Sequence, residues 1–452
     1  MATTTYTVTC LSPVHVGTGT QFSKFDGVYH DGQWHYIDLD KVLARGVNAT
    51  ELARAMNSRD FSWAMWLRDK NIVPLDVAMY ILPCSQDPEE TLIREAMKNV
   101  HKQPYLPGSS VKGAIRTAIL WSLLKRDSRL FQGVADYIAL RLQSFELLQA
   151  LDKMEGGNRK YSDPQSHERA VAQTFGNERA KALSDVLHRA LNKRVDRLQR
   201  SDFERFAEWN WRRNRVDPNP RTIDDPIDRL VMGINPNHDL MRVLQVSDTE
   251  SVGLERLAVG LVWTYTLRGS RLVEKREQNG EYKVFVEWLT PGATLQLNLR
   301  IDDFLFSNIA DRDLHFRGAK EHAVQEVAQT CKAYARTIIA SEKAFYTKYG
   351  LDILRDFYSD LEMTLSRLPK EAFLLNIGWG SGWEVKTAGD LLRTQLGPDG
   401  FKQLRQRYRL GENPKTHQLD LNGLFPHTRR IAYNRGAPMW PMGWVQLTPK
   451  ER

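Results

Sequence analysis

The chain has 452 residues, a length that predicts one large elaborated domain or two fused domains, and we expect two. Hydrophobic residues make up 42% and charged residues 26% of the sequence, a composition that supports a sizeable core and argues against disorder. The formal net charge of +8 favours a polyanionic partner.

The three cysteines, Cys10, Cys84 and Cys331, form no CxxC pair, which argues against a disulfide framework and a thiolate zinc site. The first ten residues lack the basic and apolar regions of a signal peptide, and no window reaches 18 uninterrupted apolar residues. We therefore expect a cytoplasmic protein in a reducing compartment, without a membrane partner.

The N-terminal region predicts strands followed by helices. Alternating β-branched residues predict a strand over 5–16 that runs into the turn at 17–19. Asp31-Gly32 between apolar residues is the strongest hairpin signal in residues 28–37. Residues 38–70 predict helix, with Asp38 or Asp40 as the N-cap.

The middle of the chain predicts a turn, a helix and then a charged helical insertion. The turn at 103–110 leads into helical periodicity over 111–120, and charged helical patterns continue to about residue 211. We read about 125–230 as a helical insertion in the first half. Prolines and asparagines beyond it predict a domain junction. The expected domains are 1–235, which includes the insertion, and 236–452.

The second half predicts a β-rich domain with helices. Glycine and proline punctuate its apolar alternating runs. The expected strands span 241–247, 257–267, 282–287 and 294–301, the expected helices 318–366, and a last strand enters a glycine-rich turn within 370–385. Together the halves predict an α+β fold.

A helix start at residues 107–117 has the residues needed to grip phosphate. Ser109 or Ser110 can cap the helix, whose first amides and positive dipole end favour an anion. Lys112 and Arg116 are four residues apart, so they lie on one face and offer two phosphate donors. The same residues also fit a capped surface helix with two solvated cations.

A second candidate is the glycine-rich segment 378–386. Gly378, Gly380 and Gly382 permit a tight turn against a polymer backbone, the tryptophans between them offer stacking surfaces, and Lys386 offers a phosphate contact. The spacing fits neither a dinucleotide fingerprint nor a Walker sequence. A glycine turn with core tryptophans is the alternative.

The N-terminal segment 13–19 is a third candidate, with His15 beside Gly17 and Gly19. His15 is a candidate RNA contact or acid-base group, but a lone strand histidine without a positioned partner is more often structural. Asp26 is the carboxylate to consider for a metal-independent ribonuclease. We find no histidine cluster with metal-ligand spacing and no GxSxG sequence, so we expect no metal, no cofactor and no catalytic residue.

The order of these segments resembles the RAMP superfamily of CRISPR-associated proteins. A strand runs into residues 13–19, the serine-lysine-glycine-arginine helix start follows at 107–117, then Val246-Ser247-Asp248, and then the glycine-rich loop at 378–383. Among RAMP families the chain is most similar to the fifth subunits of type III-A Csm complexes. The C-terminal segments Thr428-Arg429-Arg430 and 441–445 contribute to that similarity.

The resemblance implies two fused RRM-like (ferredoxin-like) domains and a subunit that caps the 3′ end of the guide RNA (crRNA). The implied partners are crRNA, target RNA, other Csm subunits, chiefly the neighbouring backbone RAMP subunit, and host nucleases that trim the guide. The implied RNA-binding residues are Ser109, Ser110, Lys112, Arg116, Gly378, Gly380, Gly382 and Lys386, with His15, Gly17 and Gly19 in the N-terminal segment. An RRM-like sheet normally binds RNA through aromatic residues, and the sequence does not identify that pair.

Three other functions remain open. The chain could be an endoribonuclease RAMP, processing guides through His15 or cutting target RNA through Asp26. It could be a subunit of a Cmr complex, whose RAMP proteins share the helix start and the glycine loop. It could also be a purely structural cap, which predicts RNA binding with little salt dependence.

Overall fold

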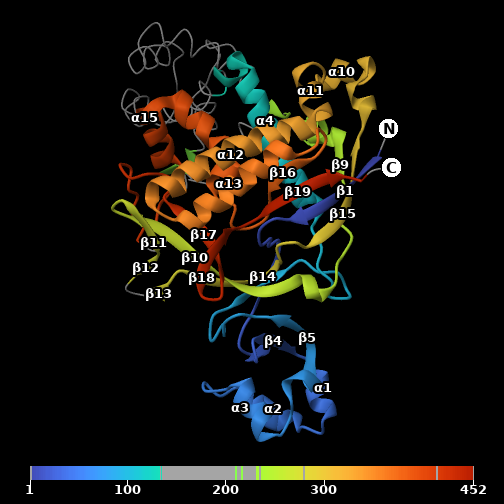
Figure 1. Ribbon diagram of the computed structural model, residues 1–452, viewed down its shortest axis with the longest axis vertical. Coiled ribbons are helices and arrows are strands. Elements are labelled where there is room, and N and C mark those ends of the chain that lie inside the picture. Colours follow the sequence, from blue (N-terminus) through green and yellow to red (C-terminus); the bar gives the residue numbers. More distant parts are fainter. Residues whose placement is uncertain are drawn as a thin grey trace, which may run out of the picture. The chain divides into compact units, whose positions relative to one another are not determined.

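The computed structural model describes residues 3–132, 134, 209–210, 215–216, 231–233, 236–277, 280–413 and 416–450 (Figure 1). The chain forms two compact units. Unit 1 comprises Met1–Ser122, Leu240–Thr387 and His427–Arg452, and unit 2 comprises Leu123–Asp239 and Ala388–Pro426. Helices and sheets occur together throughout the described residues, which confirms the predicted α+β class.

The first sheet of unit 1, sheet A, combines strands from both ends of the chain. Its order is β16-β19-β1-β15-β9, and every pair is antiparallel. The central strand β1 buries Tyr6, Val8 and Cys10, as its alternating sequence predicts. The strands are β1 (Thr3–Cys10), β9 (Leu244–Val246), β15 (Thr294–Ile301), β16 (Phe373–Asn376) and β19 (Trp444–Pro449).

The second sheet, sheet B, has the order β18-β17-β10-β14-β6-β2, with β11 also paired to β10. Here too β6 from the first half lies parallel to β14 from the second half. The strands are β2 (Gly17–Phe22), β6 (Ile93–Ala96), β10 (Leu257–Arg268), β11 (Arg271–Glu274), β14 (Lys283–Leu289), β17 (Thr428–Asn434) and β18 (Ala437–Pro441).

The predicted division into successive domains 1–235 and 236–452 does not match this arrangement. Strand β1 pairs with β15 and β19, and β6 pairs with β14, so each sheet needs strands from both predicted domains. A local sequence pattern identifies a strand but not its partners in the sheet, which explains the error. The predicted insertion at about 125–230 lies almost entirely outside the described residues.

Helices α12 (Val327–Tyr349) and α13 (Asp352–Arg367) run side by side in Figure 1 and form an antiparallel hairpin. Gly350 ends α12 in the left-handed conformation, where glycine is favoured. The buried faces include Ile338 and Tyr346 of α12 and Leu361 of α13, and α12 packs on β16. Unit 1 also contains α10 (Asn308–Leu314), α11 (Ala319–Gln325) and α14 (Trp383–Lys386).

Residues 24–92 of unit 1 form a small module with a sheet and a core of its own. The Asp31-Gly32 hairpin is confirmed, since both residues have positive φ angles of 48° and 76° between the paired strands β3 and β4. Asp38, one of the two predicted caps, accepts hydrogen bonds from the first amides of α1. The elements are β3 (Gly27–His30), β4 (Gln33–Ile37), β5 (Ala78–Pro83), α1 (Leu39–Ala44), α2 (Ala49–Met56) and α3 (Trp63–Asp69).

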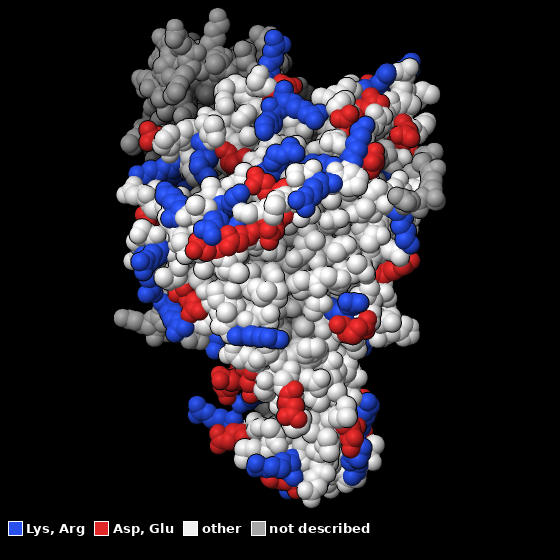
Figure 2. All heavy atoms as spheres, in the orientation of Figure 1, with Lys and Arg blue, Asp and Glu red and all other residues white. Residues whose placement is uncertain are grey.

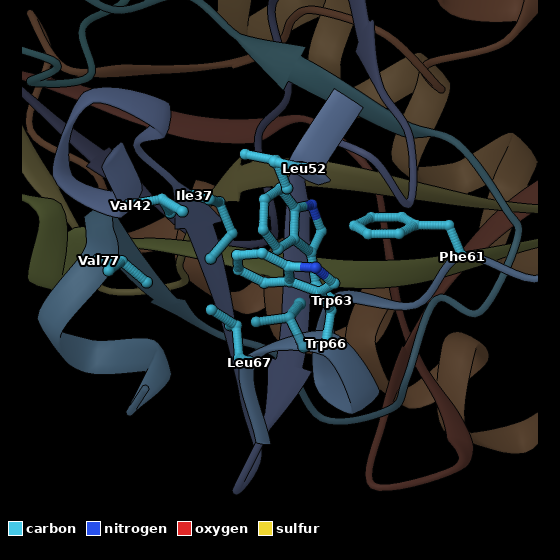
Figure 3. Close-up of a cluster of buried hydrophobic side chains, with 9 residues drawn as sticks. Ile37, Val42, Leu52, Phe61, Trp63, Trp66, Leu67 and Val77 are labelled. Carbon is cyan, nitrogen blue, oxygen red and sulfur yellow. The ribbon is translucent and has the colours of Figure 1, made fainter. Parts of the chain in front are cut away.

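Figure 3 shows the core of the small module, where side chains of its helices meet those of its sheet. Trp63 and Trp66, three residues apart on α3, pack edge to face with 5.6 Å between ring centroids. Phe61 contacts the Trp63 ring in the same manner at 5.1 Å. These rings explain how so short a segment holds a stable core.

Helix α4 (Gly108–Arg126) begins in unit 1 and ends in unit 2, which also contains α15 (Gly389–Arg407). Short pairs of strands are β7 (Trp209–Asn210) with β8 (Arg215–Val216), and β12 (Arg276–Glu277) with β13 (Gly280–Glu281). Short 3₁₀ helices span Pro74–Val77, Pro236–His238, Leu240–Val243, Leu254–Arg256 and Asp303–Phe306. Among the described residues, every helix is too short or too polar to cross a membrane.

Candidate nucleic-acid interface

The glycine-rich loop after β16 packs directly on the N-terminal segment that follows β1. The backbone N–H of Trp379 donates a hydrogen bond to the His15 carbonyl at 2.8 Å. Gly378 has a φ of 76°, and a Cβ atom there would lie 2.3 Å from the same carbonyl oxygen. Only glycine fits this position, so the contact with the His15 carbonyl explains the glycine at position 378.

Two arginines lie over the ring of Trp379. The guanidinium carbon of Arg94 on β6 is 4.9 Å from the ring centroid, and that of Arg430 on β17 is 4.4 Å away. Both distances are within the range of cation–π attraction. We call Arg94, Trp379 and Arg430 the arginine–tryptophan cluster.

Electrostatics around the arginine–tryptophan cluster favour an anion. Burial and then the charge of Arg94 lower the pKa of Arg430. Burial and then the charge of Arg430 lower the pKa of Lys386 on α14. Three cations therefore influence one another here, and a phosphate group would relieve their mutual repulsion.

His15 is buried, with 2% of its surface exposed. Its Nδ1 atom lies 2.6 Å from the carbonyl oxygen of Glu287, and its ring meets the Trp379 ring edge to face at 6.0 Å. Burial lowers the pKa of His15 to about 4, helped by the charges of Arg94 and Lys98 and opposed by the hydrogen bond to the Glu287 carbonyl. At neutral pH a neutral His15 therefore helps to position Trp379.

Glu287 of β14 holds Lys98, Tyr80 and the amide of Ala96 together through its side chain. Its fully buried carboxylate forms an ion pair with Lys98 and accepts hydrogen bonds from the Tyr80 hydroxyl at 3.1 Å and the Ala96 amide at 2.8 Å. A buried carboxylate with this many donors is held in one position. The contact with Tyr80 of β5 also joins the small module to sheet B.

The predicted phosphate-gripping helix start is α4, and its cap differs from the prediction. The Gly108 amide donates to the side chain of Asp248 at 2.7 Å, whereas Ser109 and Ser110 lie inside the first helical turn. A Cβ atom at Gly108 would approach the carbonyls of residues 246 and 247 to 2.5 Å, so the helix can start this close to β9 only with glycine. Sequence spacing could not reveal a cap that comes from 140 residues away.

Helix α4 presents its predicted basic residues beside a buried face. Val111 and Ile115 are fully buried, whereas Lys112 and Arg116 are partly exposed. Ser109 is exposed and Ser110 partly exposed at the same end of the helix. The four residues predicted to contact RNA therefore share one end of α4.

The predicted segments are linked through the chain between β6 and α4. The Met97 amide donates to the Val16 carbonyl at 2.8 Å, and the Tyr105 amide donates to the Met97 carbonyl at 3.3 Å. The next residue, Leu106, accepts a hydrogen bond from the Thr249 amide at 3.0 Å. Backbone hydrogen bonds thus connect the N-terminal segment, the start of α4 and the segment after β9.

The remaining residues predicted to contact RNA are the glycines at positions 17, 19, 380 and 382. Gly17 and Gly19 are exposed in β2, where the pairing with β6 shifts register. Gly380 packs against Met442, and Gly382 has open space where a side chain would be. Gly380 and Gly382 have φ angles of 93° and 84°, so both have the positive φ that favours glycine and that the predicted tight turn needs.

Asp26, the alternative catalytic carboxylate, closes a turn before β3. Its Oδ2 atom accepts hydrogen bonds from the Ser23 amide at 2.6 Å and the Ser23 hydroxyl at 2.8 Å. These bonds describe a turn-stabilising aspartate. Among the described residues, no three or more histidine, cysteine, aspartate or glutamate side chains group as metal ligands would.

The sequence interpretation missed Arg94 and gave Arg430 no individual role. Arg430 stands next to the apolar Ile431 on β17, and this was a usable signal, because adjacent residues of a strand point to opposite faces of the sheet. The structure also places two partly buried tryptophans, Trp379 and Trp440, against one apolar cluster of sheet B. Aromatic residues on a sheet face are the feature that the sequence did not identify.

Figure 2 shows the charge on one face of the molecule. Basic and acidic side chains lie close together over the region of α12 and α13, and an uncharged area lies over the neighbouring strands. Ion pairs account for part of this mixture, as between Lys343 and Glu362 at 2.7 Å. Such paired charges are poor candidates for a phosphate surface, unlike the cations around Trp379.

Comparisons with known proteins identify the family. The sequence model of the RAMP superfamily matches residues 7–385. A Methanocaldococcus jannaschii protein named CRISPR system Cms protein Csm5 is 20% identical over 97% of this chain and 87% of its own length. A Streptococcus thermophilus protein of the same name is 27% identical over 24% of this chain and 36% of its own length.

Solved structures show the same fold. A chain in the cryo-EM structure of a Csm–crRNA–target RNA ternary complex of a type III-A CRISPR-Cas system superposes with a TM-score of 0.61 at 24% identity. That match covers 98% of this chain and 100% of the other. The crystal structure of T. onnurineus Csm5 gives 0.56 at 21% identity, over 97% and 99% of the two chains. Since the family model spans most of its length, the chain belongs to the RAMP superfamily.

Proposed function

We propose that this chain is a non-catalytic subunit of a type III-A CRISPR Csm complex that binds the 3′ end of the crRNA. The arginine–tryptophan cluster is the observation that carries the proposal. Its two guanidinium groups, held over the Trp379 ring, suit phosphate. The similarity to proteins named Csm5, one of them solved, supports the choice of complex.

A guide-binding subunit must accept any guide sequence, so its contacts should address the RNA backbone and the faces of the bases. The glycine loop at Gly378 brings main chain close to the ring of Trp379 without intervening side chains. Lys112 and Arg116 at the start of α4 provide a second set of phosphate contacts. The two sets would hold successive parts of one strand.

The proposal extends to the fold and the partners. Sheets A and B would form the two RRM-like halves, each completed by strands of both parts of the chain. The neighbouring backbone RAMP subunit would be the main protein contact, and target RNA would enter beside the guide. Nucleases that trim the guide would act on the RNA that extends beyond this subunit.

We propose no catalytic residue for this chain. The environments of the two acid-base candidates support this: His15 is buried and neutral at physiological pH, and the Asp26 carboxylate is engaged by Ser23. A ribonuclease would need such a group within reach of a ribose hydroxyl. Cleavage of crRNA or target RNA by the purified chain in EDTA, lost in His15→Gln or Asp26→Asn, would contradict this part of the proposal.

The test of the whole proposal is to purify the complex from its host through a tagged chain and to sequence the bound RNA. We expect repeat-derived crRNA and other Csm subunits with the wild-type chain. Arg94→Ala/Arg430→Ala and Lys112→Ala/Arg116→Ala should each lose crRNA or alter its 3′ ends. Arg68→Ala, which removes an exposed arginine of the small module, is the matched control.

Unchanged crRNA recovery and unchanged 3′ ends in both double variants would overturn the role of these cations. Recovery of a different set of CRISPR proteins, such as Cmr subunits, would move the chain to another type III complex. A salt-independent association with RNA would favour a purely structural cap.

A further inference from the structure

The small module contains a cavity that the RNA proposal does not use. Its volume is about 370 Å³, and loops before β3, before α3 and after β5 surround it together with β3 itself. The charged side chains that line the cavity are two cations, Lys24 and Arg59, and four carboxylates, Asp60, Asp87, Glu89 and Glu90. This size is enough for a few residues of a peptide or one small ligand.

Strand β3 forms one wall of the cavity, and no further strand among the described residues pairs with its outer edge, where Gly27 is buried and Tyr29 partly exposed. Among the described strands β4 is its one neighbour, in the order β3-β4-β5. The Ile37 amide donates to the Asp26 carbonyl at 3.0 Å, which sets the alternation of hydrogen-bonded pairs along the hairpin. The amide and carbonyl groups of Gly27 and Tyr29 therefore point away from β4, and both residues line the cavity.

The aromatic wall of the cavity is firmly held. Phe25 stacks on Phe61 with 5.9 Å between centroids, and the Trp63 indole donates to the Phe25 carbonyl at 2.8 Å. Figure 3 shows Phe61 reaching toward Trp63 at one end of the module's core. Because core residues already fix this wall, ligand binding costs little further conformational entropy.

The charge of the cavity selects among ligands. Four carboxylates and two cations line it, and one of those cations, Lys24, is already paired with Glu90 at 3.1 Å. Asp60, Asp87 and Glu89 are exposed at the rim. Phosphate groups would be repelled here, whereas lysine or arginine side chains would be attracted.

We propose that the cavity beside β3, called the groove from here on, binds an extended, basic peptide segment of a partner protein. The peptide backbone would pair with Gly27 and Tyr29 and extend the three-stranded sheet by one strand, as edge-binding peptides do. Alternate side chains of the peptide would then point toward the carboxylates at the rim. The groove is a protein-docking site on a chain whose other surface binds RNA.

The test uses the full-length chain and a defined probe, the heptapeptide acetyl-Lys-Thr-Lys-Val-Lys-Thr-Lys-amide, with binding followed by calorimetry at low salt. Asp60→Lys should weaken the binding about tenfold, because it reverses one charge at the rim. Asp69→Lys makes the same charge change on an exposed position of α3 outside the groove and should leave the affinity within about twofold.

Two further probes test strand pairing. A heptapeptide with the same side chains but methylated at every backbone nitrogen has no main-chain N–H on either edge, so it cannot pair with an edge strand and should not bind measurably. Tyr29→Pro removes the outward-pointing amide without breaking a bond to β4, and should also abolish binding. The melting temperature of Tyr29→Pro shows whether the module stays folded, and the methylated peptide gives the same information without changing the protein.

The proposal is overturned if the heptapeptide fails to bind the wild-type chain, or if the methylated peptide binds equally well. It is also overturned if Asp60→Lys and Asp69→Lys weaken binding to the same extent, since the attraction would then be non-specific. Displacement of the heptapeptide by a short single-stranded RNA would assign the groove to nucleic acid. None of these results depends on crRNA binding at the arginine–tryptophan cluster.

Discussion

The small module and the arginine–tryptophan cluster belong to the same unit but have opposite charge. Residues 24–92 contain seven lysines and arginines against eleven aspartates and glutamates, a net charge of −4, whereas the whole chain has +8. The remaining residues therefore carry +12. A single net charge conceals this contrast, which is the reason for proposing RNA and protein partners for different surfaces.

The two regions also differ in how they are held together. The small module relies on a compact aromatic core around Trp63, formed by residues close in sequence. The cluster relies on contacts between segments hundreds of residues apart, as between His15 and Trp379. The contacts within the module's core are local in sequence, whereas the cluster depends on the completion of both sheets.

The largest effect should come from Trp63→Ala, which tests whether the small module can be destabilised without affecting the arginine–tryptophan cluster. Trp63 is 2% exposed, and its loss leaves a cavity and an unpaired carbonyl at Phe25, at a cost of about 4 kcal/mol. We expect proteolysis within residues 24–92 at lower urea, with RNA affinity changed less than about threefold. A tenfold loss of RNA affinity would show that the regions act as one.

Gly378→Ala tests the arginine–tryptophan cluster in the same way. The new methyl group would collide with the His15 carbonyl at a backbone φ of 76°, so we expect a loss of about 3 kcal/mol. Gly382→Ala is the control, since its φ of 84° strains the backbone but nothing lies within 4 Å of the new atom, and it should cost less, about 2 kcal/mol. Both are measured from urea unfolding followed by tryptophan fluorescence. Equal losses would mean that the contact with His15 contributes nothing.

The sequence predicted the local features of both regions. The Asp31-Gly32 hairpin and the Asp38 cap depend on near neighbours, and the structure confirms them. The glycine-rich loop was also predictable, because positive φ angles require its residue type.

The assembly of the cluster was not predictable, because it depends on the partners of each strand. Arg94 and Arg430 meet over Trp379 because β6, β17 and the loop after β16 converge, and one sequence has no signal for that pairing. The cap of α4 was missed for the same reason, since Asp248 comes from the segment after β9.

Acid should destabilise the cluster through His15. Burial lowers its pKa to about 4, while an unfolded histidine has a pKa near 6.5, so the unfolded chain binds the proton more tightly. This contribution is fully present above about pH 6.5 and is lost as the pH falls toward 4, a difference of about 3 kcal/mol. Denaturant unfolding from pH 7.5 to 4 measures it, and His15→Gln should flatten the profile.

His35 of the small module permits the matching measurement in the other region. Burial and then the charge of His30 lower its pKa as well, so its contribution has the same sign and is lost as the pH falls below about 6.5. Proteolysis within residues 24–92 should therefore become easier in acid, and His35→Gln should remove that change while leaving the His15 effect in place. Identical profiles for both variants would mean that another group controls the acid response.

The smallest expected effect concerns the cations of the cluster. Arg94→Ala and Arg430→Ala should each weaken binding of a single-stranded RNA by about tenfold, or about 1.4 kcal/mol, and reduce the salt slope by about one. Conversely, Asp60→Lys in the small module should leave RNA affinity unchanged if that module serves proteins alone. Fluorescence anisotropy at several salt concentrations measures both. If Asp60→Lys strengthened RNA binding as much as Arg94→Ala weakened it, the RNA would respond to the total charge of the chain, and the separation of the two surfaces would be wrong.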